Sequence, residues 1–174
     1  GLEHNDTITA LAFKHQSFAS LTGLCNLRIF IKSTDSSDFG QGSLNWLAET
    51  RNGMTLVYDT NPKDAIGNTP GFAVFEFTEV SGFEFDTTGG AINLEVLIEY
   101  TQQATQTAAI PWYVESAFSM PTFNNSDETK YRRGNSSLGL DSITNGTSIL
   151  KPTLRIYHPR YEKELRASRI YSLG

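Results

Sequence analysis

Six short runs of alternating apolar and polar residues follow one another down this chain of 174 residues. Turn-forming residues separate the runs. Alternation with a period of two places apolar side chains on one face of a strand, so each run predicts a strand with one buried face. We therefore expect an all-β protein built as an antiparallel β-sandwich. The runs cover residues 27–32, 54–59, 72–80, 82–86, 92–101 and 110–118.

The composition agrees with many short strands joined by loops. The chain contains 11 Phe and 7 Tyr, which favour strands, and its hydrophobic share is 39% because Thr, Ser, Asn and Gly are abundant. Its length fits one domain with a sizeable core. We expect residues 1–121 to form the sandwich. We expect residues 122–174 to form a polar arm and a basic C-terminal tail of the same domain, because large apolar residues become scarce after Pro121.

Residues 6–16 leave two interpretations open. The β-branched run from Thr7 to Thr9 favours a strand. The apolar spacing favours a short helix or turn, with one face formed by Ile8, Leu11, Ala12 and His15. Near the other end of the chain, a short strand is expected around Leu154 and Ile156, and one or two helical turns over residues 161–169.

The charge of the chain is unevenly distributed. The net charge is −5, but residues 151–174 carry +4, which leaves −9 for the first 150 residues. Tyrosines alternate with the basic residues of this tail, as contact with phosphates and stacked bases would require. A solvated surface or ion pairs to acidic neighbouring subunits would need the same residues. The candidate RNA or subunit contacts are Arg132, Arg133, Arg155, Arg160, Lys163, Arg166 and Arg169.

The residue types that usually bind metals or act as nucleophiles are sparse in this chain. The three histidines lack metal-ligand spacing, and Cys25, the one cysteine, is expected to be a small buried residue in a reducing compartment. Residues 35–40 are loosely similar to a calcium loop but lack the closing Glu. No run approaches the ~20 apolar residues of a membrane helix. We expect no metal, no cofactor and no membrane partner.

Paired carboxylates do not predict a glycosidase. Glu95 and Glu99 share a strand face but would lie about 13 Å apart, beyond the range that glycosidases use. Glu84 and Asp86 would lie about 7 Å apart, yet they alternate with phenylalanines and should face solvent. We therefore expect that the protein is not an enzyme. An alternative function is a carbohydrate- or ligand-binding sandwich, whose contacts would be Trp46, Tyr58, Trp112 and Tyr113 if these are exposed.

Residues 18–118 resemble the later part of a picornavirus-like capsid jelly roll. A small-residue turn leads into the strand over residues 21–29, and a strand runs into Pro62. Ser81 and Gly82 then divide two further strands, and a long alternating strand over residues 92–101 precedes a final one over residues 112–118. The size and the acidic, cysteine-poor body are most similar to the small coat proteins of plant secoviruses, especially the cheraviruses with their three small coat proteins.

The resemblance implies a viral jelly roll over residues 1–121. It also implies a structural coat protein that assembles with copies of itself and sister coat proteins into an icosahedral shell around an RNA genome. The expected location is the virion, and the host cytoplasm during assembly. A full jelly roll has eight strands. Six or seven are evident here, and the first two are expected before Leu27, where the pattern is weak.

Overall fold

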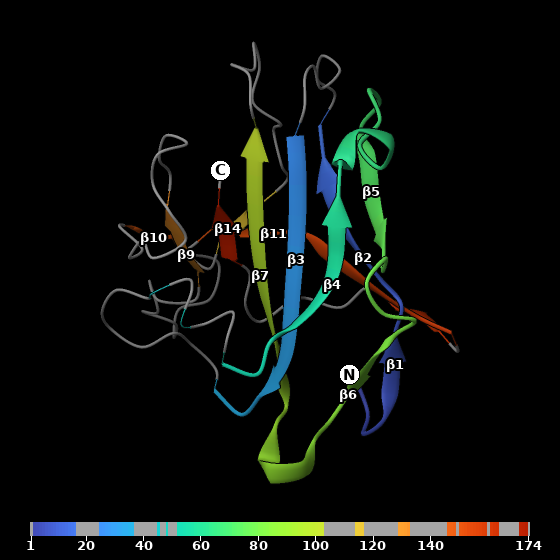
Figure 1. Cartoon of the computed structure of the whole chain (residues 1–174), viewed down its shortest axis with the longest axis vertical. Helices are drawn as coiled ribbons and strands as arrows, with labels where there is room; N and C mark the ends of the chain where they lie inside the picture. Colours follow the sequence, from blue (N-terminus) through green and yellow to red (C-terminus); the bar gives the residue numbers. More distant parts are fainter. Residues whose placement is uncertain are drawn as a thin grey trace.

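The structure is a computed structural model, and most of the regular structure in the part of the chain that it describes is β-strand (Figure 1). Short 3-10 helices, η1 Pro62–Asp64 and η2 Thr88–Gly90, lie in two of the turns. Within these residues, no helix has the length and hydropathy needed to cross a bilayer. The described residues are 2–16, 25–36, 45, 48, 52–102, 114–116, 129–132, 146–148, 150–159, 161–163 and 171–173.

The larger sheet has six strands in the order β10-β9-β14-β7-β3-β4. Its long strands β3 and β7 pair antiparallel from Cys25 opposite Gln102 to Thr34 opposite Asn93. Strand β4 pairs antiparallel with β3, with a shift in register after Ile29. Strand β14 runs parallel to both β7 and β9. The strand bounds are β3 Cys25–Thr34, β4 Thr55–Thr60, β7 Asn93–Gln102, β9 Thr129–Arg132, β10 Gly146–Ser148 and β14 Tyr171–Leu173.

The smaller sheet has four antiparallel strands in the order β13-β12-β2-β5. Two further antiparallel pairs, β1 with β6 and β8 with β11, each form a separate two-stranded sheet. The bounds are β1 Asp6–Ile8, β2 Ala10–His15, β5 Gly71–Glu76, β6 Phe83–Phe85, β8 Val114–Ser116, β11 Leu150–Pro152, β12 Leu154–His158 and β13 Tyr161–Lys163.

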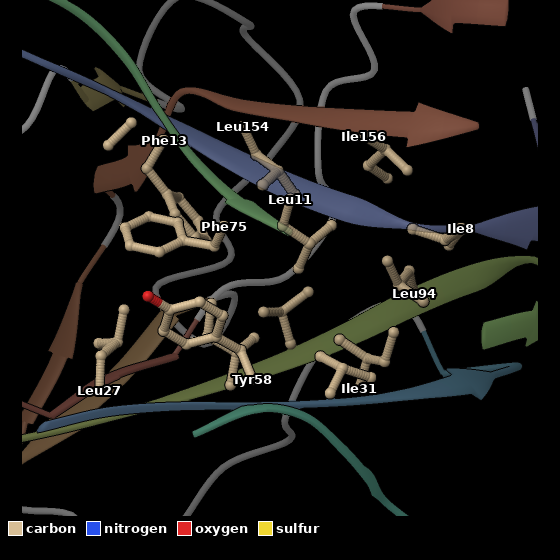
Figure 2. Close-up of a cluster of buried hydrophobic side chains, with 14 of the residues drawn as sticks. Ile8, Leu11, Phe13, Leu27, Ile31, Tyr58, Phe75, Leu94, Leu154 and Ile156 are labelled. Carbon is tan, nitrogen blue, oxygen red and sulfur yellow. The ribbon is translucent and has the colours of Figure 1, made fainter. Parts of the chain in front are cut away.

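One hydrophobic core lies between the two main sheets (Figure 2). In the close-up, Leu11, Phe13 and Phe75 of the smaller sheet point toward side chains of the larger one. The ring of Phe75 lies 5.3 Å from that of Tyr58, edge to face, and 6.0 Å from that of Phe13. The larger sheet contributes alternate residues of β3 and β7, namely Cys25, Leu27, Ile29, Ile31, Leu94 and Val96.

The prediction of an all-β chain with mostly antiparallel sheets is confirmed, and the facing sheets are consistent with a sandwich. Runs 27–32, 54–59, 82–86 and 92–101 coincide with β3, β4, β6 and β7. The run over 72–80 forms a shorter strand than expected, because β5 ends at Glu76 and a turn follows. Of the run over 110–118, the described residues are β8 alone.

Of the two interpretations left open for residues 6–16, the strand is confirmed and the short helix or turn is wrong, because these residues form β1 and β2. Leu11 and Phe13 face the core, whereas Ala10 and Ala12 alternate with them on the opposite face and are also buried, with Ala12 at 0% exposure. A strand covered on both faces loses the apolar–polar alternation, so the spacing of its apolar residues mimics a helix.

The C-terminal third of the chain takes part in both main sheets. Leu154 and Ile156 of β12 are buried in the core, which confirms the strand expected there. Strands β9 and β10 lie within the segment expected to be a polar arm, and β14 lies in the expected tail. Of the helical turns expected over residues 161–169, residues 161–163 are instead strand β13, paired with β12, and residues 164–169 lie outside the described residues. The sequence could not reveal this pairing, because a short strand is specified by its neighbour more than by its own pattern.

Gly82 lies where β6 approaches β1 too closely for a side chain. A Cβ built on Gly82 would lie 2.5 Å from Cγ2 of Thr7 and 3.4 Å from the carbonyl oxygen of Ile8. We expect Gly82→Ala to lower the free energy of unfolding by about 1–3 kcal/mol through this overpacking. Gly67→Ala is the matched control, because a Cβ there meets nothing within 4 Å. Equal urea midpoints for both variants would contradict the close approach of β1 and β6.

Candidate functional site

Arg155 is the predicted contact residue whose side chain the structure describes. It lies on β12 between the inward-facing Leu154 and Ile156, so its side chain points away from the core. Its guanidinium carbon lies 4.0 Å from the centroid of the Phe72 ring on β5. Strand β2 runs between β12 and β5, and Ala12 is the residue opposite Arg155. The small Ala12 side chain leaves room for the guanidinium to reach the ring, where a cation–π contact holds it.

The other candidate contact residues do not share one strand or one sheet. Lys163 ends β13, opposite Ile156, in the same sheet as Arg155. Arg132 ends β9 in the six-stranded sheet, opposite Leu173. The topology therefore brings Arg155 and Lys163 onto neighbouring strands and places Arg132 in the other sheet. The remaining candidates lie outside the described residues, namely Arg133, Arg160, Arg166 and Arg169.

A row of charges crosses three strands on the outer face of the larger sheet. Arg28 of β3 lies opposite Asp59 of β4 and Glu99 of β7. Its Nε lies 3.2 Å from an Asp59 carboxylate oxygen, and one terminal nitrogen lies 3.7 Å from Glu99 Oε2. Asn26 donates a second hydrogen bond of 2.6 Å to Asp59. The register of the sheet therefore gives one arginine two carboxylate partners.

A second charged pair lies on the same face, four residues further along both strands. Lys32 of β3 lies opposite Glu95 of β7, with 3.3 Å between Nζ and Oε2. Both side chains are largely buried, at 17% and 5% exposure. Between the two charged rows, Phe30 lies opposite Leu97, which is 1% exposed. The outer face of the larger sheet is therefore largely buried around Leu97 and Glu95, rather than the solvated polar face that alternation suggests.

The surroundings of Glu99 raise the pKa of its carboxyl group above its ordinary value. Burial is the largest cause, the charge of Arg28 opposes it, and the charge of Asp59 adds to it. A raised pKa means that the folded state holds the proton more tightly than the unfolded chain does. The contribution of Glu99 to stability is therefore greatest at low pH. It declines as the pH rises from the ordinary pKa of a glutamate through the raised pKa in the folded state.

We expect Glu99→Gln to remove this pH dependence. The free energy of unfolding of the wild type, relative to the variant, should fall as the pH rises from about 4.3, the ordinary glutamate pKa, through the raised pKa. Urea unfolding at a series of pH values measures the difference. Glu84→Gln, which removes a carboxylate from an exposed position, is the control. A stability difference between the wild type and Glu99→Gln that stays flat or rises with pH would contradict the raised pKa of Glu99.

Three of the four acidic residues singled out in the sequence, Glu95, Glu99 and Asp86, have structural partners. Glu95 and Glu99 each lie opposite a cation, as described above. Glu84 and Asp86 are exposed on either side of the buried Phe85, as expected from the sequence. The pKa of Asp86 is lowered by two hydrogen bonds that its carboxylate accepts from Thr88. The bond from the Thr88 hydroxyl has the larger effect, and the bond from the Thr88 backbone N–H follows. Among the residues that the structure describes, no cluster of three or more His, Cys, Asp or Glu side chains could hold a metal ion.

Tyr58 does not match the expectation of an exposed sugar-binding aromatic. It is 5% exposed, and its ring packs against Phe75 in the core. Trp46, Trp112 and Tyr113 lie outside the described residues. The described part of the chain therefore offers no support for the alternative of a carbohydrate-binding module.

The ion pairs between β3 and β7, partly or largely buried, are the feature that the sequence analysis missed. Arg28 and Lys32 are spaced by four residues on β3, as Glu95 and Glu99 are on β7. This matched spacing of opposite charges on two strands is the signal that could have indicated their pairing. Comparison of the chain with protein-family models, with curated proteins and with solved structures found no significant match.

Proposed function

We propose that the chain is a structural capsid protein with a jelly-roll fold, which assembles with copies of itself and with sister coat proteins into an icosahedral shell around an RNA genome. The order of the strands within the two main sheets is the observation that carries this proposal. The protein acts in the virion, and it is present in the host cytoplasm during assembly.

In a jelly roll, eight strands named B to I form two facing sheets with the orders B-I-D-G and C-H-E-F. If β2 corresponds to strand D, the chain continues as E in β3, F in β4, G in β5, H in β7 and I in β12. The smaller sheet contains the order β12-β2-β5, which corresponds to I-D-G, and the larger contains β7-β3-β4, which corresponds to H-E-F. Every neighbouring pair among these strands is antiparallel, as the jelly roll requires.

The connections between these strands support the same correspondence. The chain crosses from one sheet to the other between β2 and β3, β4 and β5, β5 and β7, and β7 and β12. The step from β3 to β4 stays within one sheet, as the step from E to F does. A simple up-and-down sandwich would instead place consecutive strands side by side in one sheet.

The positions of strands B and C differ from a standard jelly roll. Strand β13 lies beside β12 in the position of B, and β14 lies beside β7 in the position of C. Both come from the C-terminal end of the chain, and β14 is parallel to β7 where a C strand would be antiparallel to H. The correspondence therefore covers strands D to I.

Contact with neighbouring subunits or with RNA is proposed for the seven basic candidates. Arg155 suits a contact with another subunit, because the Phe72 ring holds its guanidinium on the face of the smaller sheet that points away from the core. A preorganised arginine loses little conformational entropy when it meets a carboxylate or a phosphate.

Expression of the chain together with its sister coat proteins tests the proposal. We expect the chain to sediment in a sucrose gradient in a particle much larger than a single subunit, together with RNA that resists added nuclease. The chain expressed without these partners is the control for assembly by copies alone. A chain that remains a stable monomer, alone and with every candidate sister protein, would rule the proposal out.

A further inference from the structure

Among the residues that the structure describes, no strand pairs with the outer edge of β5. Strand β5 is the last strand of the smaller sheet and lies at the margin of the molecule in Figure 1. The backbone N–H of Phe77 donates to the carbonyl of Thr9. Hydrogen-bonded residues alternate along an antiparallel ladder, so Phe75 and Ala73 pair with β2 in the same way. The N–H and C=O groups of Phe72, Val74 and Glu76 therefore point away from the sheet.

The corresponding edge of the larger sheet is covered. The N–H groups of Thr78 and Glu79 both donate to the carbonyl of Val57 on β4. The hydroxyl of Thr78 also accepts a hydrogen bond from the N–H of Asp59. Among the described residues, none hydrogen-bonds to the outer edge of β5 in this way. An uncovered edge of this kind is a template for pairing with another strand.

We propose that two copies of this chain pair through β5, antiparallel, about a two-fold axis at Val74. Val74 then lies opposite Val74 of the second copy, and Phe72 lies opposite Glu76 of the second copy. Every outward N–H and C=O group of these three residues gains a partner, and the two four-stranded sheets join into one. A two-fold contact is self-complementary, so a single edge is sufficient for both copies.

The charges beside this edge favour a second copy as the occupant. Arg155 covers the ring of Phe72, and Lys14 lies opposite Phe72 on β2. The exposed Glu76 lies at the other end of β5, on the same face as Phe72. Two-fold pairing therefore brings Glu76 of each copy to the Phe72–Arg155 pair of the other. The edge carries its own complementary charge, which an unrelated strand would have to supply separately.

This inference goes beyond the proposed capsid function and does not depend on it. A β5–β5 pair can form in an isolated dimer or between subunits of a larger particle.

Disulfide trapping with Val74→Cys tests the pairing geometry. Directly opposite residues in a hydrogen-bonded antiparallel pair have Cα atoms about 5.5 Å apart, within the range that a disulfide spans. Mild oxidation of the purified full-length variant should give a covalent dimer on a non-reducing gel. The wild type, whose buried Cys25 is the one native cysteine, and Glu84→Cys, on an exposed position of β6, should remain uncross-linked. Failure of Val74→Cys to cross-link, or equal cross-linking of Glu84→Cys, would overturn the proposal.

A charge swap tests the pairing of Glu76 with Arg155. Glu76→Arg and Arg155→Glu should each weaken dimerisation at least about tenfold, measured by analytical ultracentrifugation, because each places like charges together at two symmetric points. The double variant should restore dimerisation. Circular dichroism checks that all three variants are folded, and Glu84→Arg should leave dimerisation unchanged. A wild type that stays monomeric at every concentration, or a dimer that both single variants preserve, would overturn the proposal.

Discussion

Phe75→Ala should lower the free energy of unfolding by about 3–5 kcal/mol, the largest stability effect that we expect from a single substitution. Phe75 is 1% exposed, and its ring lies between those of Phe13 and Tyr58. The substitution removes contacts to both sheets at once and leaves a cavity between them. Since a domain of this size is stable by about 5–15 kcal/mol, this loss is a large share of the total stability.

Urea unfolding, followed by tyrosine and tryptophan fluorescence and by circular dichroism, measures this effect. Ile92→Ala is the matched control, because Ile92 is a large apolar residue that is 77% exposed. The control should stay within about 0.5 kcal/mol of the wild type. An effect of Phe75→Ala as small as that of the control would mean that the two sheets do not share the core around Phe75.

Lys32→Met should lower the free energy of unfolding by about 3 kcal/mol, the second of the large effects. The substitution keeps most of the aliphatic stem but removes the cation 3.3 Å from Glu95, whose side chain is 5% exposed. A buried carboxylate that loses its cationic partner is strongly destabilising. Replacement of both partners by apolar residues of similar size is often nearly neutral, so Lys32→Met combined with Glu95→Leu should recover most of the loss.

A double-mutant cycle over these two positions isolates the pair. The exposed pair of His4 and Asp86, with 3.6 Å between Nδ1 and Oδ1, is the control, and His4→Gln should change stability by less than about 1 kcal/mol. Additive effects of Lys32→Met and Glu95→Leu would contradict a direct interaction across β3 and β7. A single variant as stable as the wild type would show that Glu95 is not buried in this environment.

The strands with one polar and one apolar face were predictable from the sequence. In β3, Leu27, Ile29 and Ile31 face the core and alternate with polar residues and Phe30. Burial of apolar side chains is the dominant driving force in folding, and it selects this face regardless of which strands are neighbours. For the same reason the all-β class and most strand positions follow from local pattern alone.

Strands buried on both faces were not predictable in this way. Ala10 and Ala12 of β2 lie on the side opposite the core and are buried nevertheless. Because alanine occurs on both buried and exposed faces, these two residues do not show the alternation of a strand in the sequence. Their small side chains also leave room for Arg155 to lie across β2 toward Phe72. The outer face of β7 is a second case, because Leu97 is buried there between two carboxylates.

The partners of the charged residues were not predicted from the sequence. Lys32 and Glu95 meet because β3 and β7 adopt one register out of several possible ones, and a shift by one residue would move every side chain to the other face. Arg155 similarly meets Phe72 across an intervening strand. Such contacts depend on strand order, which is set by the whole fold. The matched spacing of opposite charges on β3 and β7 is a sequence signal for the first pairing, but the sequence holds no corresponding signal for the contact of Arg155 with Phe72.

Electron microscopy of the negatively stained protein, purified together with its sister coat proteins, tests the central claim most directly. The capsid proposal predicts isometric particles of one uniform diameter that contain this chain, and it predicts their loss in Phe75→Ala but not in Ile92→Ala. A field of small monomers or irregular aggregates, from wild-type chains that are folded by circular dichroism, would contradict the account.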